Sequence, residues 1–248
     1  MRAMAASSNE PIESMGEPNR VLSGRLIVTI DGPAGTGKSS VARDVAKRLV
    51  LTVLDTGAMY RAAALLTLRL GIGPTDGAGI AKALGTHHIE MDFDAETPNV
   101  LLDGSDPGEE IRGPEVESIV SLVAAHPQVR NRLVAVQRAV AASHSRLVTE
   151  GRDQGSVVFP DADARFYLTA SSQVRATRRV NQLRKKGHEV DVESVLQGIE
   201  ARDRLDAGRA DGPLIRPDGA IEIETDQLQL AEVVDRIVEA VRKTGRDS

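Results

Sequence analysis

Hydrophobic positions along this chain follow two alternating patterns. Short runs rich in branched apolar residues, each of strand length, occur at residues 26–31, 50–55, 146–150, 165–169 and 221–225. Longer stretches with apolar residues three and four apart, typical of amphipathic helices, lie between and after them, at residues 38–49, 56–71, 114–144, 172–187, 192–209 and 229–243. This alternation predicts an α/β fold of three layers, with a mostly parallel sheet covered by helices on both faces.

Two departures from the alternation change this picture. Residues 87–93 and 99–104 alternate apolar and polar positions around a polar turn near Pro98, which predicts a small β-hairpin inserted into the fold. Pro127 interrupts the helical stretch 114–144, because proline removes a helix hydrogen bond.

Composition narrows the class of protein. The chain has 248 residues, no cysteine, only 2% aromatic residues and a net charge of −5. These values exclude a disulfide or thiolate-metal framework and argue against general nucleic-acid binding. No stretch approaches a membrane span, and residues 1–24 form a polar segment without an apolar signal core. We expect a disordered leader followed by one domain over residues 25–248, in a cytoplasmic monomer without membrane or nucleic-acid partners.

Residues 26–40, LIVTIDGPAGTGKSS, carry the most informative motif. The pattern G-x-x-x-x-G-K-S follows a strand and opens a helix, which is the context of a nucleotide phosphate loop. Its backbone N–H groups cradle phosphates, Lys38 reaches the outer phosphates, and the Ser39 hydroxyl can ligate Mg²⁺. The predicted ATP-binding residues are Gly32, Pro33, Ala34, Gly35, Thr36, Gly37, Lys38, Ser39 and Ser40.

Arginines lie where parallel strands end. Arg61 follows the second strand in LDTGAMYR, and Arg152 follows the third in EGRDQG. Ligands of open α/β sheets bind beyond the carboxyl ends of strands, so these arginines should face the phosphate loop. Further charged residues follow on two helices, and each of these can equally belong to a solvated helix face: Arg175, Arg178, Arg179, Arg184, Arg202, Asp203, Asp206 and Arg209.

The arginines of the chain favour a phosphate group over a hydroxyl group as the acceptor in the transfer. A hydroxyl group needs a positioned base, and none stands out. A nucleoside monophosphate has a second phosphate pKa near ~6 and is already anionic at neutral pH. It needs cancelled repulsion and in-line positioning, which arginines and Mg²⁺ supply.

Seven motifs of the chain occur in an order that resembles the bacterial cytidylate kinases. They are GPAGTGKSSVA, LDTGAMYRA, IRGPEV, VSLVAAHPQVR, EGRDQGSVVFPDA, RATRR and RDRLDAGR before GPL. The resemblance extends from about residue 25 to the C-terminus. It implies transfer of the γ-phosphoryl group of ATP to CMP or dCMP with Mg²⁺. It also implies a monophosphate-binding insertion near 84–112 and a helical, arginine-bearing lid near 174–187.

The resemblance also assigns residues to roles. It implies that Lys38, Arg152 and Arg178 act in catalysis, and that Arg61, Arg152 and Arg209 hold the CMP phosphate. The full predicted CMP-binding set is Thr56, Tyr60, Arg61, Ser121, Arg130, Arg152, Asp153, Arg202, Asp206 and Arg209. In that set Ser121, Arg130 and Asp153 face the base, while Arg202 and Asp206 face the sugar.

Physical chemistry supports part of the base assignment. An ionised Asp153 accepts from the cytosine N4 amine and would repel the O4 of uracil. Arg130 can donate to O2 and N3 of cytosine. Without the resemblance, Ser121 and Arg130 look like an ordinary helix serine and a surface arginine.

Some neighbours depart from the family pattern. Gln154 replaces a usually apolar residue, Ser156 stands where threonine is common, and Ala207 stands where serine is frequent. These changes bear on the sugar preference and not on the reaction. The five histidines show no spacing that indicates a zinc site.

Two other functions share the phosphate loop. A shikimate-type kinase would phosphorylate a hydroxyl group and should carry an extra carboxylate base and fewer arginines. A guanine nucleotide switch would need an N-K-x-D segment to read the base, and the chain has none.

Overall fold

The computed structural model describes residues 24–94, 98–185 and 187–244, so the predicted leader lies outside it except for Gly24. Five parallel strands form the central sheet in the order β2-β5-β1-β6-β7. Their bounds are β1 (Leu26–Asp31), β2 (Thr52–Asp55), β5 (Arg146–Gly151), β6 (Ala164–Thr169) and β7 (Ile221–Glu224). The predicted parallel sheet is confirmed, and β1, which leads into the phosphate loop, is its central strand.

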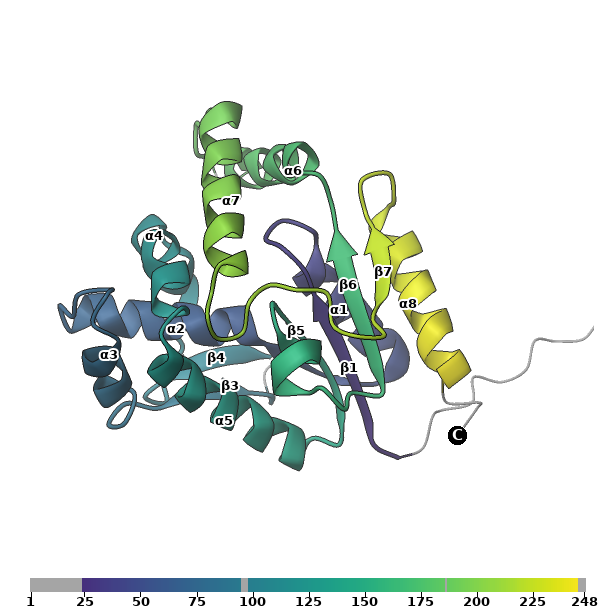
Figure 1. Ribbon diagram of the computed structural model, residues 1–248, viewed down its shortest axis with the longest axis horizontal. Coiled ribbons are helices and arrows are strands. Elements are labelled where there is room, and N and C mark those ends of the chain that lie inside the picture. Colours follow the sequence, from purple (N-terminus) through teal and green to yellow (C-terminus); the bar gives the residue numbers. More distant parts are fainter. Residues whose placement is uncertain (1–23, 95–97, 186, 245–248) are drawn as a thin grey trace, which may run out of the picture.

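Helices cover both faces of this sheet, as predicted (Figure 1). On one face, α1 (Lys38–Leu49) packs against α8 (Leu230–Thr244). On the other lie α2 (Thr56–Arg69), α4 (Pro114–Val123) and α5 (Pro127–Ser143). Successive side chains of β1 alternate between the two cores: Val28 lies in the first and Ile27 in the second.

The inserted hairpin is also confirmed. Strands β3 (Ile89–Asp92) and β4 (Asn99–Leu102) pair antiparallel and lie apart from the main sheet. A short helix, α3 (Gly77–Ala83), and a 3₁₀ turn, η1 (Gly108–Arg112), complete this region. The hydrophobic pattern did not reveal α3, because its seven residues are too few to show a helical period.

Proline divides the long helical stretch as predicted. The first helix ends at Val123, and Pro127 occupies the first turn of α5, where its missing N–H costs no hydrogen bond. A single π-helical turn, η2 (Gln154–Val158), follows β5. Among the described residues, no helix is long and apolar enough to cross a membrane.

Helices α6 (Ser172–Lys185) and α7 (Val192–Ala207) lie beyond the carboxyl end of the sheet (Figure 1). They pack against one another, and α7 also touches α4. The buried residues of α6 are Arg175, Ala176 and Val180. The region expected to be a lid therefore contains a buried arginine as well as exposed ones.

The junction between α1 and β2 holds a strained residue. Val50 has φ of 54° and ψ of 62°, the left-handed region that a β-branched residue rarely adopts. Its side chain is 70% exposed and contributes little to the core. The turn thus carries backbone strain that apolar burial does not offset.

We expect Val50→Gly to raise the free energy of unfolding by about 0.5–1 kcal/mol, because glycine adopts this conformation without strain. Urea denaturation measures the change. Leu70→Gly is the matched control, since Leu70 follows α2 with an ordinary φ of −90° and its replacement should be destabilising. Equal effects of the two substitutions would contradict the strain at Val50.

Candidate phosphoryl-transfer site

The phosphate loop lies between β1 and α1, at the centre of the sheet. Gly32 has φ of 145°, and a Cβ there would overlap the backbone oxygen of Leu168 on β6. Thr36 donates its hydroxyl proton to the Pro33 oxygen at 3.0 Å and closes the loop. The loop can therefore take this path only with glycine at its first position.

Lys38 points back into the loop. Its Nζ donates to the Pro33 oxygen at 2.7 Å, and only 5% of the residue is exposed. Burial, followed by repulsion from Arg152, lowers the pKa of Lys38 to about 7. A phosphate anion placed beside this ammonium would reverse the shift, so the site is electrostatically prepared for an anion.

Glu150 is a functional candidate that the sequence reasoning noted at a strand end without giving it a role. The Ser39 hydroxyl donates to its Oε1 at 2.5 Å, so the carboxylate at the end of β5 faces the first turn of α1. Burial and the nearby Asp55 raise the pKa of Glu150. The signal available in the sequence was an acidic residue ending a strand that pairs with the phosphate-loop strand.

Two arginines predicted to bind phosphate converge on one carboxylate. Arg152 Nε donates to Asp206 Oδ2 at 2.8 Å, and Arg209 donates to Asp206 Oδ1. Burial pushes the pKa of Asp206 upward, but Arg152, Arg209 and Arg202 together hold it below its ordinary value. Thus β5 and α7, far apart in sequence, bring the predicted phosphate and sugar residues together.

Positive charge in this cluster exceeds what the carboxylates satisfy. The buried Nε atoms of Arg61, Arg202 and Arg209 have no hydrogen-bond acceptor within the described part of the chain. Burial and repulsion from Arg152 lower the pKa of Arg202 to about 10. Buried donors without acceptors are costly, so these three guanidinium groups indicate a place for an anionic ligand.

The predicted base-binding residues form a second buried group. Arg130, 1% exposed on α5, donates to Asp153 Oδ2 and, at 3.4 Å, to the Tyr60 hydroxyl oxygen. Its Nε lies 3.3 Å from Asp211 Oδ2. Gly212, with φ of 60°, packs directly on Arg130 and Asp153, and a Cβ there would overlap both. The surface reading of Arg130 is therefore wrong, because the fold buries it between two carboxylates.

Thr56 and Ser121 are two further residues that the sequence predicts to bind CMP. Thr56 donates its hydroxyl proton to the Glu150 backbone oxygen at 2.7 Å and ties the start of α2 to the end of β5. Ser121 is buried on α4, the helix that touches α7.

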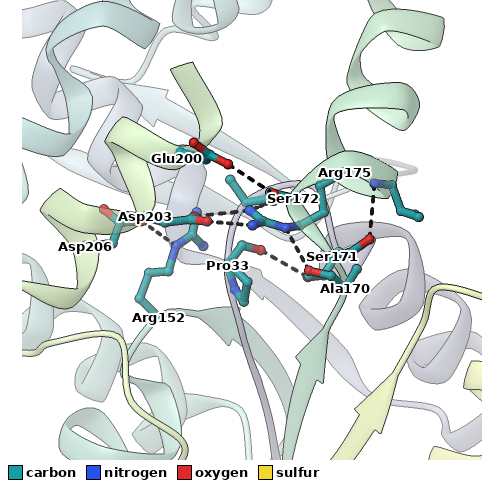
Figure 2. A network of polar contacts seen from close by, with 12 residues as sticks. Pro33, Arg152, Ala170, Ser171, Ser172, Arg175, Glu200, Asp203 and Asp206 are labelled. Carbon is teal, nitrogen blue, oxygen red and sulfur yellow. Dashed lines mark hydrogen bonds and ion pairs between the residues drawn. The ribbon is translucent and has the colours of Figure 1, made fainter. Parts of the chain in front are cut away.

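Two arginines of α6, Arg175 and Arg178, contact different neighbours. Figure 2 shows Arg175 reaching from α6 to Asp203 on α7, where two nitrogens donate to the carboxylate at 2.6 and 3.1 Å. Arg175 also donates to the Ala34 oxygen of the phosphate loop at 3.1 Å. Arg178, predicted to be catalytic, instead donates to Thr225 after β7, with 2.9 Å to its Oγ1. Arg175, and not Arg178, is thus the α6 arginine that contacts the phosphate loop here.

Comparison with known proteins identifies the family of this chain. A family model described as "Cytidylate kinase" matches residues 28–243. The chain belongs to the cytidylate kinase family. The cytidylate kinase of Rhodococcus jostii is 47% identical over 222 residues, which cover 89% of this chain and 97% of the relative. The cytidylate kinase of Caldanaerobacter subterraneus is 48% identical over 219 residues, or 88% and 96% of the two chains.

The similarity of this chain to solved structures is weaker than its similarity to these relatives. A shikimate kinase from Bacteroides thetaiotaomicron shares 13% identity and a TM-score of 0.45, covering 88% of this chain and 98% of that one. A similarity at this level does not bear on the reaction. The family resemblance deduced from the motifs is confirmed by the family match and by the close relatives.

The lowered pKa of Lys38 generates a prediction about proton uptake. Above about pH 7 the free protein holds Lys38 largely neutral, and the phosphates of ATP should restore its charged form. ATP binding at about pH 8.5 should therefore take up close to one proton. Calorimetric titration in buffers of different ionisation enthalpy measures this uptake.

Lys38→Met is the control for that measurement, and its uptake should fall to nearly zero. A wild-type binding enthalpy that does not depend on the buffer would contradict the lowered pKa of Lys38 in the free protein.

Proposed function

We propose that phosphoryl transfer takes place where the phosphate loop, the Asp206-centred arginine cluster and the Arg130–Asp153 pair meet. As a member of the cytidylate kinase family, the chain transfers the γ-phosphoryl group of ATP to CMP or dCMP, giving ADP and CDP or dCDP. The observation that carries the site is that the buried guanidinium Nε atoms of Arg61, Arg202 and Arg209 have no acceptor among the described residues.

These arginines fit the needs of the acceptor. The phosphate of CMP is already a nucleophile at neutral pH, so the protein must bring two anionic phosphates together. Arg61 and Arg209 would hold the acceptor phosphate, and Arg152 between Asp206 and Lys38 would bridge it to the γ-phosphate. Guanidinium groups suit this task because they bind phosphate oxygens in pairs.

Lys38 and the loop N–H groups would hold the donor. As charge develops on the transferring phosphoryl group, a preorganised ammonium in a buried site stabilises it strongly. Loss of such a contact typically costs ~10²–10³ in rate. Arg178 can join them only if its guanidinium leaves Thr225, so its predicted catalytic role requires this side chain to release that contact.

The residues present fit Mg²⁺ beside the loop. Ser39 and Glu150 offer hard oxygen atoms in contact with one another, and Mg²⁺ commonly uses one or two protein oxygens together with phosphates and water. When bound, the ion would neutralise charge on the β- and γ-phosphates. Ser39 would be its direct ligand, and Glu150 would hold Ser39 or a metal-bound water.

Base selection would depend on Asp153. Arg130 and Asp153 are 1% and 3% exposed and are covered by Gly212, so a base reaches them only after the loop carrying Asp211 and Gly212 shifts. Asp153 would then accept from the cytosine N4 amine, and Arg130 would donate to O2 and N3. Ser121, Tyr60 and Thr56 would line this pocket, with Arg202 and Asp206 at the sugar.

A panel of acceptors tests the function directly. ADP release should be fastest with CMP and dCMP, much slower with UMP and AMP, and absent with shikimate or without an acceptor. Comparable rates with shikimate would favour a hydroxyl acceptor. Nucleotide binding without ADP release on any acceptor would favour a switch.

Replacing Asp153 by Asn tests the base assignment. The ratio of kcat/KM for CMP over that for UMP should fall roughly ten- to a hundredfold, since one such contact is worth about 1–3 kcal/mol. The loss should be mainly on CMP. Steady-state kinetics with both acceptors provide the measurement.

Asp211→Asn is the matched control, because Asp211 also faces Arg130 but is not assigned to the base. Thermal unfolding must accompany both variants, since Asp153 is half of a buried ion pair. A folded Asp153→Asn variant with the wild-type ratio would show that Asp153 does not read the base.

A further inference from the structure

Gln154, directly after the proposed base-reading residue, is completely buried. The reaction described above gives it no role. Burying an amide is unfavourable unless its hydrogen bonds are made. The contacts of Gln154 therefore indicate what it contributes.

Its backbone is held by the phosphate-loop strand. The N–H groups of Gln154 and Gly155 donate to the two oxygens of Asp31, at 2.8 and 2.7 Å. Asp31 is the last residue of β1 and is fully buried. The turn after Asp153 is thus anchored to the strand that leads into the phosphate loop, which restricts where the Gln154 side chain can point.

Its side chain is held on two further sides. The Thr149 hydroxyl donates to Gln154 Oε1 at 2.8 Å, and Gln154 Nε2 donates to Gln137 Oε1 at 3.3 Å. Gln137 is fully buried on α5, two helical turns after Arg130, so one face of α5 contacts both Asp153 and Gln154.

The remaining contact of the Gln154 side chain is with Asp153, the residue proposed to read the base. Gln154 Nε2 lies 3.4 Å from Asp153 Oδ1, while Arg130 holds Asp153 Oδ2. A carboxylate can only accept hydrogen bonds, so this contact requires the amide nitrogen, and not its oxygen, to face Asp153. Thr149 binds the oxygen in agreement with that orientation.

We propose that Gln154 is a positioning residue for base selection: it donates to the second oxygen of Asp153 and fixes the plane of the carboxylate that cytosine meets. The inference depends on the proposed reading of the base by Asp153. A carboxylate held by Arg130 at one oxygen alone could still turn about its Cβ–Cγ bond. With both oxygens held, the lone pairs that face the pocket keep one direction.

Gln154→Met tests this role, because methionine keeps the length of the side chain and cannot donate. The ratio of kcat/KM for CMP over UMP should fall about three- to tenfold, the size expected for one supporting hydrogen bond. The change should appear mainly in the KM for CMP, with kcat at saturating CMP within about twofold, because the phosphate-binding residues are unchanged.

Stability must be separated from positioning. Gln154→Met leaves Gln137 buried without its partner, and Gln137 Nε2 already has none among the described residues. The double variant Gln137→Leu/Gln154→Met removes both amides, so its Tm should recover toward the wild-type value. Its base ratio should remain as low as that of Gln154→Met. Gln197→Met, on the exposed face of α7, is the control for a glutamine replaced elsewhere.

Three results would overturn the proposal. The first is a wild-type ratio of kcat/KM for CMP over UMP in folded Gln154→Met, while Asp153→Asn lowers that ratio. This result would leave base reading by Asp153 intact. Another is a ratio that recovers together with Tm in the double variant, which would make Gln154 purely structural. The third is a wild-type ratio in Asp153→Asn as well, which would remove the base assignment itself.

Discussion

The constraint on which this structure depends is the burial of positive charge at the carboxyl edge of a parallel sheet. Burial, and after it repulsion from the nearby Arg152, lower the pKa of Lys38. Uncompensated burial of charge is expensive, so the carboxylates of Asp206 and Glu150 are placed among the cations. They compensate only in part, and the remaining unsatisfied donors are what an anionic substrate can use.

The topology makes this concentration of charge possible. Because β1 pairs with β5 and β6, the residues that follow three neighbouring strands meet at one edge. Gly32 passes close to β6, Glu150 ends β5 beside Ser39, and Asp31 binds the turn after Asp153. The proposed donor and acceptor parts of the site are therefore held by the same short segments of backbone.

The acceptor side is assembled differently. The residues proposed for it come from α2, α4, α5 and α7 and from the turns after β5 and α7, so their arrangement depends on how these helices pack beyond the sheet. Arg175 connects α6 to α7 and to the phosphate loop, and Gly212 closes over Arg130 and Asp153. In the proposed site, entry of the base would require this loop to move, which would link recognition of the acceptor to the position of α7.

The amino-acid sequence by itself determined the elements and the donor site. Hydrophobic periodicity predicted the five strands and the main helices, and the glycine-rich motif before Lys38 predicted the phosphate loop, because both are local properties of the chain. The family resemblance supplied the roles of Arg130, Ser121 and Asp153. Without it, Arg130 looks like a surface arginine and Ser121 like an ordinary helix serine.

Only the tertiary structure decided which of these side chains meet. The local hydrophobic pattern does not specify the order of the strands in the sheet. The contact of Glu150 with Ser39 could therefore not be deduced from their separation in sequence. Nor could the pattern distinguish Arg175, buried against Asp203, from Arg178, which binds Thr225, although three positions separate them on one helix. The burial of Gln154 beside Asp153 likewise depends on α5 packing over the end of β5. Such pairings are set by packing between elements distant in the chain, and this is why the sequence could name the residues of the site but not their partners.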